Sequence, residues 1–311
     1  MLARIAENLF WLSRYMERAD YVARLLQAAG HMSAVRPESD SVTEWESAIV
    51  AAGAKESFFA SSSVSEESVV HHLAFDPQNS SSIVSCIETA RRNARAVRTA
   101  LNTEAWEAVN GAWLELHQFP RELSQDERIR FLEWVKARIG LFQGVFANTT
   151  LRMDSFHFFR IGQFLERADN TARLLDVKYH VRLPRVEDVG GVIDYYQWLA
   201  VLRVVAARRA YRVLFKGHVE PAQVAELLVL RPEFPRSLRF SYQRIVDHLE
   251  LIEDQDPHRV AEAKRLAHGL LVRLTYSSID EVISGGLHEF LSDIVERTTE
   301  LGGAIARAHH F

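Results

Sequence analysis

The chain has 311 residues, of which 48% are hydrophobic and 25% are charged, and this ordinary globular balance excludes a disordered chain. Its formal net charge of −4 provides no overall attraction to nucleic acid or to an anionic membrane. The single cysteine, Cys86, excludes an internal disulfide framework and a metal site made of several cysteines, so we expect a reducing cytoplasm.

Charged residues occur throughout the first twenty positions, so we expect no signal peptide. From position 3 to position 32, apolar side chains recur every three or four residues, which predicts one long amphipathic helix. The most apolar long segment, 192–215, contains Asp194 and four arginines. We therefore predict a core helix there and no membrane span.

Signals for the start of a helix recur along the rest of the chain. Ser124 followed by Glu127 matches the capping-box pattern. Pro221, Pro235 and Pro257 stand where the first position of a helix accepts proline. Only eight prolines and fourteen glycines interrupt the periodicity, so the sequence predicts about a dozen helices and no strand, which is an all-α fold.

One segment occurs twice. Asn8 to Leu26 and His157 to Leu175 are identical at nine of nineteen positions, at an offset of 149. Unrelated helices of this composition would share about one or two. We therefore predict an internally duplicated helical bundle, a single body with a first repeat, 1–148, and a second repeat, 149–311. The two long motif helices are expected at its centre, related by a rotation of about 180°.

Both copies contain the tetrapeptide Glu-Arg-Ala-Asp, at 17–20 and at 166–169. The motif charges align with large hydrophobic side chains along each helix, so each charge needs a partner, because burying an unpaired charge is costly. Two interpretations stay open: a buried ion-pair network that joins the two helices, or a polar pocket whose arginines hold a carboxylate or a phosphate. The residues concerned are Glu17, Arg18, Arg24, Glu166, Arg167 and Arg173.

A second candidate site follows Pro235. If this proline starts a helix, free backbone N–H groups lie beside Arg236, Ser237 and Arg239. A helix N-terminus, a hydroxyl group and guanidinium groups together suit an anion. The alternative is a capped helix start whose arginines bind internal carboxylates.

Arg91, Arg95 and Arg98 recur on one face of a predicted helix, and a basic stripe of this kind can contact phosphates. Acidic helices surround the stripe in the sequence, and no aromatic platform is interleaved with it. A solvated or salt-bridged face is therefore the favoured interpretation, and we expect no nucleic-acid partner.

No self-contained catalytic machinery is visible in the sequence. It contains no phosphate-binding glycine loop, no nucleophile elbow and no pair of Glu-x-x-His helices, so we expect no metal and no cofactor. Cys86 lies between Ile83 and Ile87 in a predicted helix and is interpreted as a small buried hydrophobic residue.

The order of these motifs resembles the alpha-E family, all-helical bacterial domains named for a Glu-Arg motif. The resemblance covers essentially the whole chain and rests on the runs 4–11 and 14–20, Phe75-Asp76-Pro77, Ala90-Arg91-x-Asn93, Trp106-x-x-x-Asn110, Glu166-Arg167 and Pro235-Arg236-Ser237. Two positions depart from the family pattern: Ser80-Ser81 stands where a proline is common, and Gln163 replaces a frequent arginine.

The resemblance implies a protein encoded beside, or fused to, a circularly permuted ATP-grasp ligase, with a transglutaminase-like peptidase as a further typical neighbour. ATP-grasp enzymes activate carboxylates as acyl phosphates to form amide bonds. The implied setting is therefore bacterial peptide or amide synthesis or modification, an association and not a mechanism.

Two functions stay open on this basis. The first is a helical partner that docks the ligase and helps to position its substrate. The second is an enzyme in its own right, which transfers an acyl group or an amine in a pocket formed by Glu17, Glu166 and the motif arginines. A strongly shifted carboxylate pKa in a cleft would favour the enzyme, and a dry, fully paired network would favour the partner.

Overall fold

The computed structural model describes residues 3–34, 41–180, 191–252 and 257–311, and within these ranges it contains helices and no strand. The predicted all-α fold is confirmed. Fifteen α-helices and one π-helical turn, His71–Phe75, lie in the described ranges, more than the dozen expected. Helices as short as α3 (Lys55–Phe59) and α14 (Ile279–Ser284) do not span enough residues to produce a periodic pattern.

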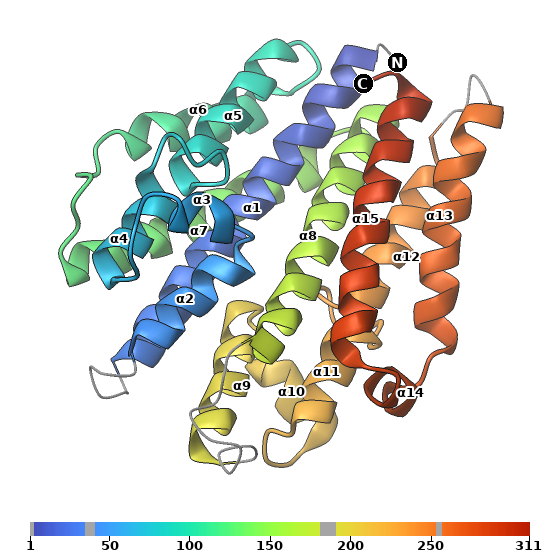
Figure 1. Cartoon of the computed structure of the whole chain (residues 1–311). Helices are drawn as coiled ribbons and strands as arrows, with labels where there is room; N and C mark the ends of the chain where they lie inside the picture. Colours follow the sequence, from blue (N-terminus) through green and yellow to red (C-terminus); the bar gives the residue numbers. More distant parts are fainter. Residues whose placement is uncertain (1–2, 35–40, 181–190, 253–256) are drawn as a thin grey trace.

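Two long helices, α1 (Ala3–Ser33) and α8 (Asp154–His180), form the centre of the molecule. They lie side by side and run in the same direction (Figure 1). The two backbones approach closely at Gly162, where an added Cβ would overlap the backbone oxygen of Phe10 and the hydroxyl of Ser13. A glycine is therefore required at this position of α8.

Helix α1 is buried around most of its circumference. Leu9, Leu12 and Met16 belong to the hydrophobic core of the first half of the chain, whereas Phe10 and Leu25 belong to that of the second half. Since α1 packs against both cores, its apolar residues are not confined to one stripe.

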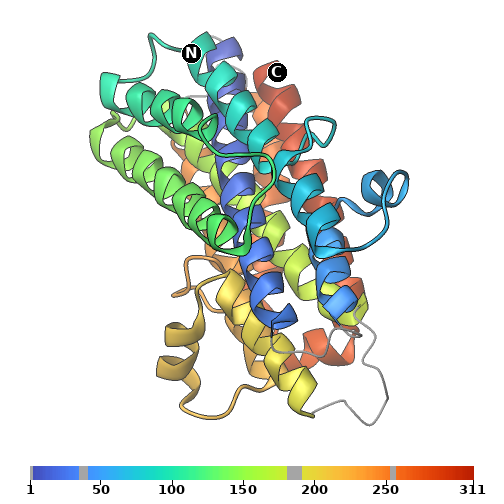
Figure 2. The same cartoon turned by 90° about the vertical axis from the view of Figure 1, so that its left-hand side faces the viewer.

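Further helices pack around each central helix. On the side of α1 these are α2 (Ser41–Ala51), α3, α4 (Glu66–Val70), α5 (Ile83–Ala96), α6 (Thr103–Leu116) and α7 (Gln125–Thr149). Figure 2 shows α5, α6 and α7 in front of α1. On the side of α8 are α12 (Leu238–Glu250), α13 (Pro257–Tyr276) and α15 (Leu287–His309). The end of the molecule is formed by α9 (Val192–Val204), α10 (Arg208–Phe215) and α11 (Pro221–Val229) (Figure 1).

The start signals at three positions are confirmed. The Ser124 hydroxyl accepts a hydrogen bond from the backbone N–H of Glu127, and the Glu127 carboxylate accepts one from the backbone N–H of Ser124. Pro221 and Pro257 are the first residues of α11 and α13. None of the helices in the described ranges has a stretch apolar and long enough to cross a bilayer.

The segment 192–215 differs from its prediction, because it forms two helices and not one. Ala206 adopts a left-handed backbone conformation with φ of 56°, which ends α9 and turns the chain into α10. The boundary predicted after residue 148 lies in the last turn of α7, and five residues separate it from the start of α8. The duplication itself stays a prediction.

Candidate functional site

Both glutamates of the repeated motif are buried between the central helices. Glu17 of α1 is 0% exposed, and Glu166 of α8 is 1% exposed. Because the two helices are parallel and in register, each glutamate lies beside arginines of the other helix. We call this cluster the Glu–Arg network; it comprises Arg14, Glu17, Arg18, Asp20, Arg24, Glu166, Arg167, Asp169, Arg173 and Arg236.

Glu166 binds two arginines of α1. The Nε of Arg14 lies 2.8 Å from Glu166 Oε2, and the Nε of Arg18 lies 2.6 Å from Glu166 Oε1. Arg18 also donates from Nη2 to Glu166 Oε2 at 3.1 Å, which makes this contact bidentate. Its Nη1 donates to the Ser81 hydroxyl at 3.2 Å. Charge-assisted contacts with two parallel hydrogen bonds are the strong ones in proteins.

Glu17 is also bound by two arginines. Arg167 donates from Nε and from Nη2 to the two carboxylate oxygens, at 2.7 and 2.8 Å. Arg236, from the segment before α12, lies 3.2 Å from Glu17 Oε1. Two side-chain amides add hydrogen bonds to Glu17 Oε2, from Gln143 of α7 at 3.1 Å and from Gln163 at 3.4 Å.

The two halves of the network are reciprocal without being identical. Arg14 has Gln163 as its counterpart in the second repeat, so α8 provides only one guanidinium group to Glu17. Arg236 supplies the second positive charge from another element. Arg236 therefore takes the place of the arginine that α8 lacks at position 163.

Arg24 and Arg173 lie one turn further along the central helices and bind aspartates. The Nε of Arg24 is 2.8 Å from Asp20 Oδ2, and the Nε of Arg173 is 2.8 Å from Asp169 Oδ2. Asp20 also binds Arg236, at 2.9 Å. Sequence reasoning missed both aspartates as partners, although each stands four residues before its arginine, the spacing of neighbours on a helix.

Burial by itself would raise the pKa of Glu17 and of Glu166, because water no longer solvates the charge. In each case the two bound guanidinium groups outweigh burial and lower the pKa to about 2. The same contacts raise the pKa of Arg18 and of Arg236 against the opposing effect of burial. Glu17 and Glu166 are therefore ionised throughout the neutral range.

The arginines form the outer layer of the network and the glutamates form its inside. The side chains of Arg14, Arg18, Arg167 and Arg236 are 11–23% exposed, whereas those of the two glutamates are 1% exposed. The structure thus brings the predicted motif residues together as ion pairs, and the carboxylates of the two glutamates are almost completely shielded from solvent.

The second candidate site begins later than predicted. Helix α12 starts at Leu238, because the Ser237 hydroxyl caps it by accepting a hydrogen bond from the N–H of Phe240. Pro235 is therefore not its first residue, and that prediction is wrong. The fully buried Ser237 hydroxyl also donates to the backbone oxygen of Arg231, at 2.6 Å.

The arginines of this segment bind internal groups. Arg236 contacts Glu17 and Asp20, as described above, and Arg239 Nη1 lies 3.5 Å from the backbone oxygen of Leu230. An anion would have to compete with these partners, so the geometry matches the alternative of a capped helix start with internally paired side chains.

Arg91 and Arg95 of the basic stripe lie on α5, but Arg98 lies in the turn after this helix ends at Ala96, so the prediction of one helical face is wrong for Arg98. The surroundings of the stripe also differ from the expectation. Trp113 and Trp106 of α6 lie against Arg91 and Arg98. Aromatic residues are therefore interleaved with the stripe in space. The sequence pattern missed them because they belong to the following helix.

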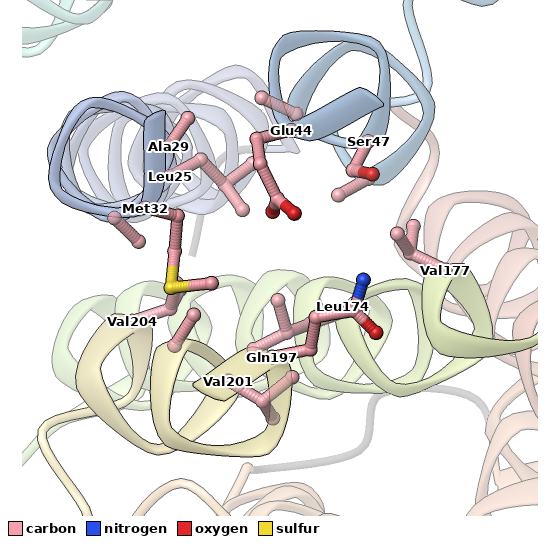
Figure 3. Close-up of a pocket in the computed structure, with 14 residues that line it drawn as sticks. Leu25, Ala29, Met32, Glu44, Ser47, Leu174, Val177, Gln197, Val201 and Val204 are labelled. Carbon is pink, nitrogen blue, oxygen red and sulfur yellow. The ribbon is translucent and has the colours of Figure 1, made fainter. Parts of the chain in front are cut away.

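A small apolar cavity lies between α1, α2, α8 and α9 (Figure 3). Its first lining residue on α1 is Leu25, which stands eight positions after Glu17. Its volume is about 70 Å³, and Leu25 and Leu174, which correspond to each other in the two repeats, both line it. Its polar lining residues are Glu44, Ser47 and Gln197, and Figure 3 shows the first and last of these extending toward each other. Sequence reasoning missed this cavity because four separate helices supply its walls.

Other reactive groups of the described residues are few. No three His, Cys, Asp or Glu side chains in these ranges are grouped so that they could hold a metal ion. Cys86 is buried, as predicted, and burial raises the pKa of its thiol to about 12. It is therefore a neutral thiol at physiological pH.

The fold and the network define a class of protein, an all-helical domain in which buried Glu–Arg pairs join two parallel central helices. The chain belongs to the Alpha-E family, described as a predicted alpha-helical domain with a conserved ER motif, which matches residues 1–310. It is 24% identical, over 315 residues, to uncharacterized proteins of Mycobacterium bovis and Mycobacterium tuberculosis. The alignment covers 94% of this chain and 35% of each relative, so the chain spans about a third of their length. No solved structure matches it.

Proposed function

We propose that this chain is a helical partner of a circularly permuted ATP-grasp ligase, and that it docks the ligase and helps to position its substrate in peptide or amide synthesis or modification. The family resemblance supplies the kind of partner. The observation that carries the proposal is the pairing of Glu17 and Glu166, each buried and bound by two arginines. Such pairs fix the register of the central helices and so favour a rigid scaffold.

The alternative, an enzyme in its own right, needs a carboxylate that exchanges a proton near neutral pH and contacts the substrate. A pKa of about 2 keeps Glu17 and Glu166 ionised, and their burial withholds them from a substrate. The network therefore supports the partner more strongly than the enzyme.

The length of the relatives supports the same proposal. In the mycobacterial proteins the matched region makes up 35% of the chain, so there it is joined to a long remainder. Covalent linkage gives two modules a high effective concentration for each other. Docking of this domain on a ligase would provide the same proximity.

The test is to purify the chain with an ATP-grasp ligase from the same genome and to measure complex formation and ATP turnover. We expect a complex, a turnover raised above that of the ligase alone, and none from this chain alone. Turnover by this chain alone would favour the enzyme. Absence of both a complex and stimulation would contradict the proposed partner.

A further inference from the structure

Helices α5 and α6 lie side by side on the outer side of the first half (Figures 1 and 2). Along their contact, the Arg91 guanidinium lies 3.9 Å from the ring centre of Trp113, and the Arg98 guanidinium lies 5.4 Å from that of Trp106. Arg91 Nε also donates to Asn110 Oδ1, at 2.9 Å. Two arginines of this face thus lie against indole rings. We call Arg91, Arg95 and Arg98 the arginine ladder.

The charges of the ladder have no counter-ion among the residues that the structure describes. Across residues 3–34, 41–180, 191–252 and 257–311, no ion pair involves Arg91, Arg95 or Arg98. Arg95 and Arg98 are exposed, and Arg91 is half-buried. Glu88, one turn before Arg91, lies 3.9 Å from His117. By contrast, every arginine of the Glu–Arg network contacts a carboxylate.

Arg91 is held in place by its neighbours. It stacks on Trp113, and its Nε is hydrogen-bonded to Asn110. A guanidinium group fixed on an aromatic face loses little rotamer entropy on binding and keeps a planar edge of N–H donors. Such an edge fits a carboxylate or a phosphate through two parallel hydrogen bonds.

The tryptophans indicate which class of partner fits. Proteins that bind single-stranded nucleic acids stack bases on exposed aromatic faces. Trp106 and Trp113 pack against the core of the first half and also lie beneath arginines, so their faces are already occupied. This arrangement favours carboxylates of a protein over the bases and phosphates of a nucleic acid.

The spacing of the ladder indicates the form of the partner. Arg91 and Arg95 stand four residues apart on α5, about 6 Å along its axis, and Arg98 follows in the turn after the helix. Acidic residues one turn apart on another helix present carboxylates at a matching interval. We propose that the arginine ladder docks an acidic helix of a partner protein. This inference rests on the proposed function, for which it names the contact surface: the ligase would supply the acidic helix.

Calorimetric titration of the full chain with a synthetic helical peptide that has glutamates at i, i+4 and i+7 tests the surface without the ligase. Arg95→Glu/Arg98→Glu should weaken binding at least about tenfold, since the reversed charges repel the peptide. Arg208→Glu/Arg212→Glu on α10 changes the net charge equally at other exposed positions and should leave binding unchanged. Arg91→Lys keeps the charge, removes the planar fork and should also weaken binding.

Equal binding of the peptide to the ladder variant and to the α10 control, or no binding at all, would overturn the proposal. So would tighter binding of a single-stranded oligonucleotide of equal charge, which would mark a nucleic-acid surface. Self-association that the ladder variant abolishes in sedimentation experiments would overturn it too, because the occupant would then be a second copy.

The ligase separates this inference from the proposed function. A ligase complex that survives Arg95→Glu/Arg98→Glu would remove the ladder as the contact and leave the proposed function standing. Peptide binding that the same variant abolishes, without any ligase complex, would support the ladder and contradict the ligase as its partner.

Discussion

Glu17 stays ionised in the interior because both of its oxygens accept hydrogen bonds from guanidinium groups. Its removal would not simply delete a contact. Arg167 and Arg236 would remain, largely buried and without the carboxylate that balances them. At the scale of the residue, each member of the network therefore stabilises the fold mainly by keeping its buried partners from being left as unpaired charges.

Glu17→Gln should lower the free energy of unfolding by about 3–5 kcal/mol, because it leaves two buried guanidinium groups underneutralised. Urea and thermal unfolding measure this loss. Glu296→Gln on the exposed face of α15 is the matched control and should change stability by no more than about 0.5 kcal/mol.

Ligase stimulation by the same variant separates the two interpretations of the motif. If the network is structural, stimulation should fall only in proportion to the unfolded fraction. A folded Glu17→Gln protein that fails to stimulate would indicate a working site. Unchanged stability together with unchanged stimulation would contradict both interpretations.

Acid should destabilise the protein in a defined window. The pKa of Glu17 and of Glu166 is lowered on folding from 4.5 to about 2, so their stabilising effect is complete above pH 4.5 and is lost as the pH falls toward 2. Each carboxylate contributes on the order of 3 kcal/mol.

Urea unfolding at pH values between 7 and 2 measures this loss of stability. Glu17→Gln should show a shallower decline, since it has one titrating group fewer. A free energy of unfolding that stays constant from pH 5 to pH 2.5 would contradict the pairing.

At the scale of the element, the contact between α1 and α8 depends on Gly162. Gly162→Ala should destabilise by about 1–3 kcal/mol, because the new methyl group overlaps the backbone of α1 at Phe10 and the helices must separate. Gly140→Ala on α7, where an added Cβ meets nothing, should instead stabilise by about 0.5–1 kcal/mol. Equal effects at the two glycines in chemical denaturation would disprove the close approach.

The two central helices, and the contact between them, could be predicted from the sequence. The repeated nineteen residues combine strong periodicity with charges that need partners. The start of α12 could not be predicted, because its cap depends on a hydroxyl contact at Ser237 two residues after the proline that signalled a start. The break at Ala206 is a backbone conformation that no residue type marks. Gln143 reaches Glu17 from 126 positions away, so only the fold reveals the contact.

At the scale of the whole molecule, the reciprocal contacts support our proposal that two halves descend from one unit. The first repeat contains Arg14, Glu17 and Arg18 on a single helix. Two copies of it, paired through α1 as α1 now pairs with α8, would give each Glu17 two guanidinium groups.

Residues 1–150 alone should therefore form a parallel homodimer through α1, since the isolated half also exposes Phe10 and Leu25. Sedimentation equilibrium measures its mass, and Glu17→Gln should weaken the dimer. A folded monomer of this fragment would contradict the proposed origin.

The order in which the chain is synthesised determines when the two central helices can pair. A ribosome reaches α8 about 10–30 s after α1, at usual rates of translation. During that interval the nascent first half carries Glu17 on an uncovered apolar face, the kind of surface that chaperones bind. Glu166 meets Arg14 and Arg18 as soon as α8 emerges, but the ion pair between Arg236 and Glu17 forms last. The centre of the molecule therefore closes only after translation has passed residue 236.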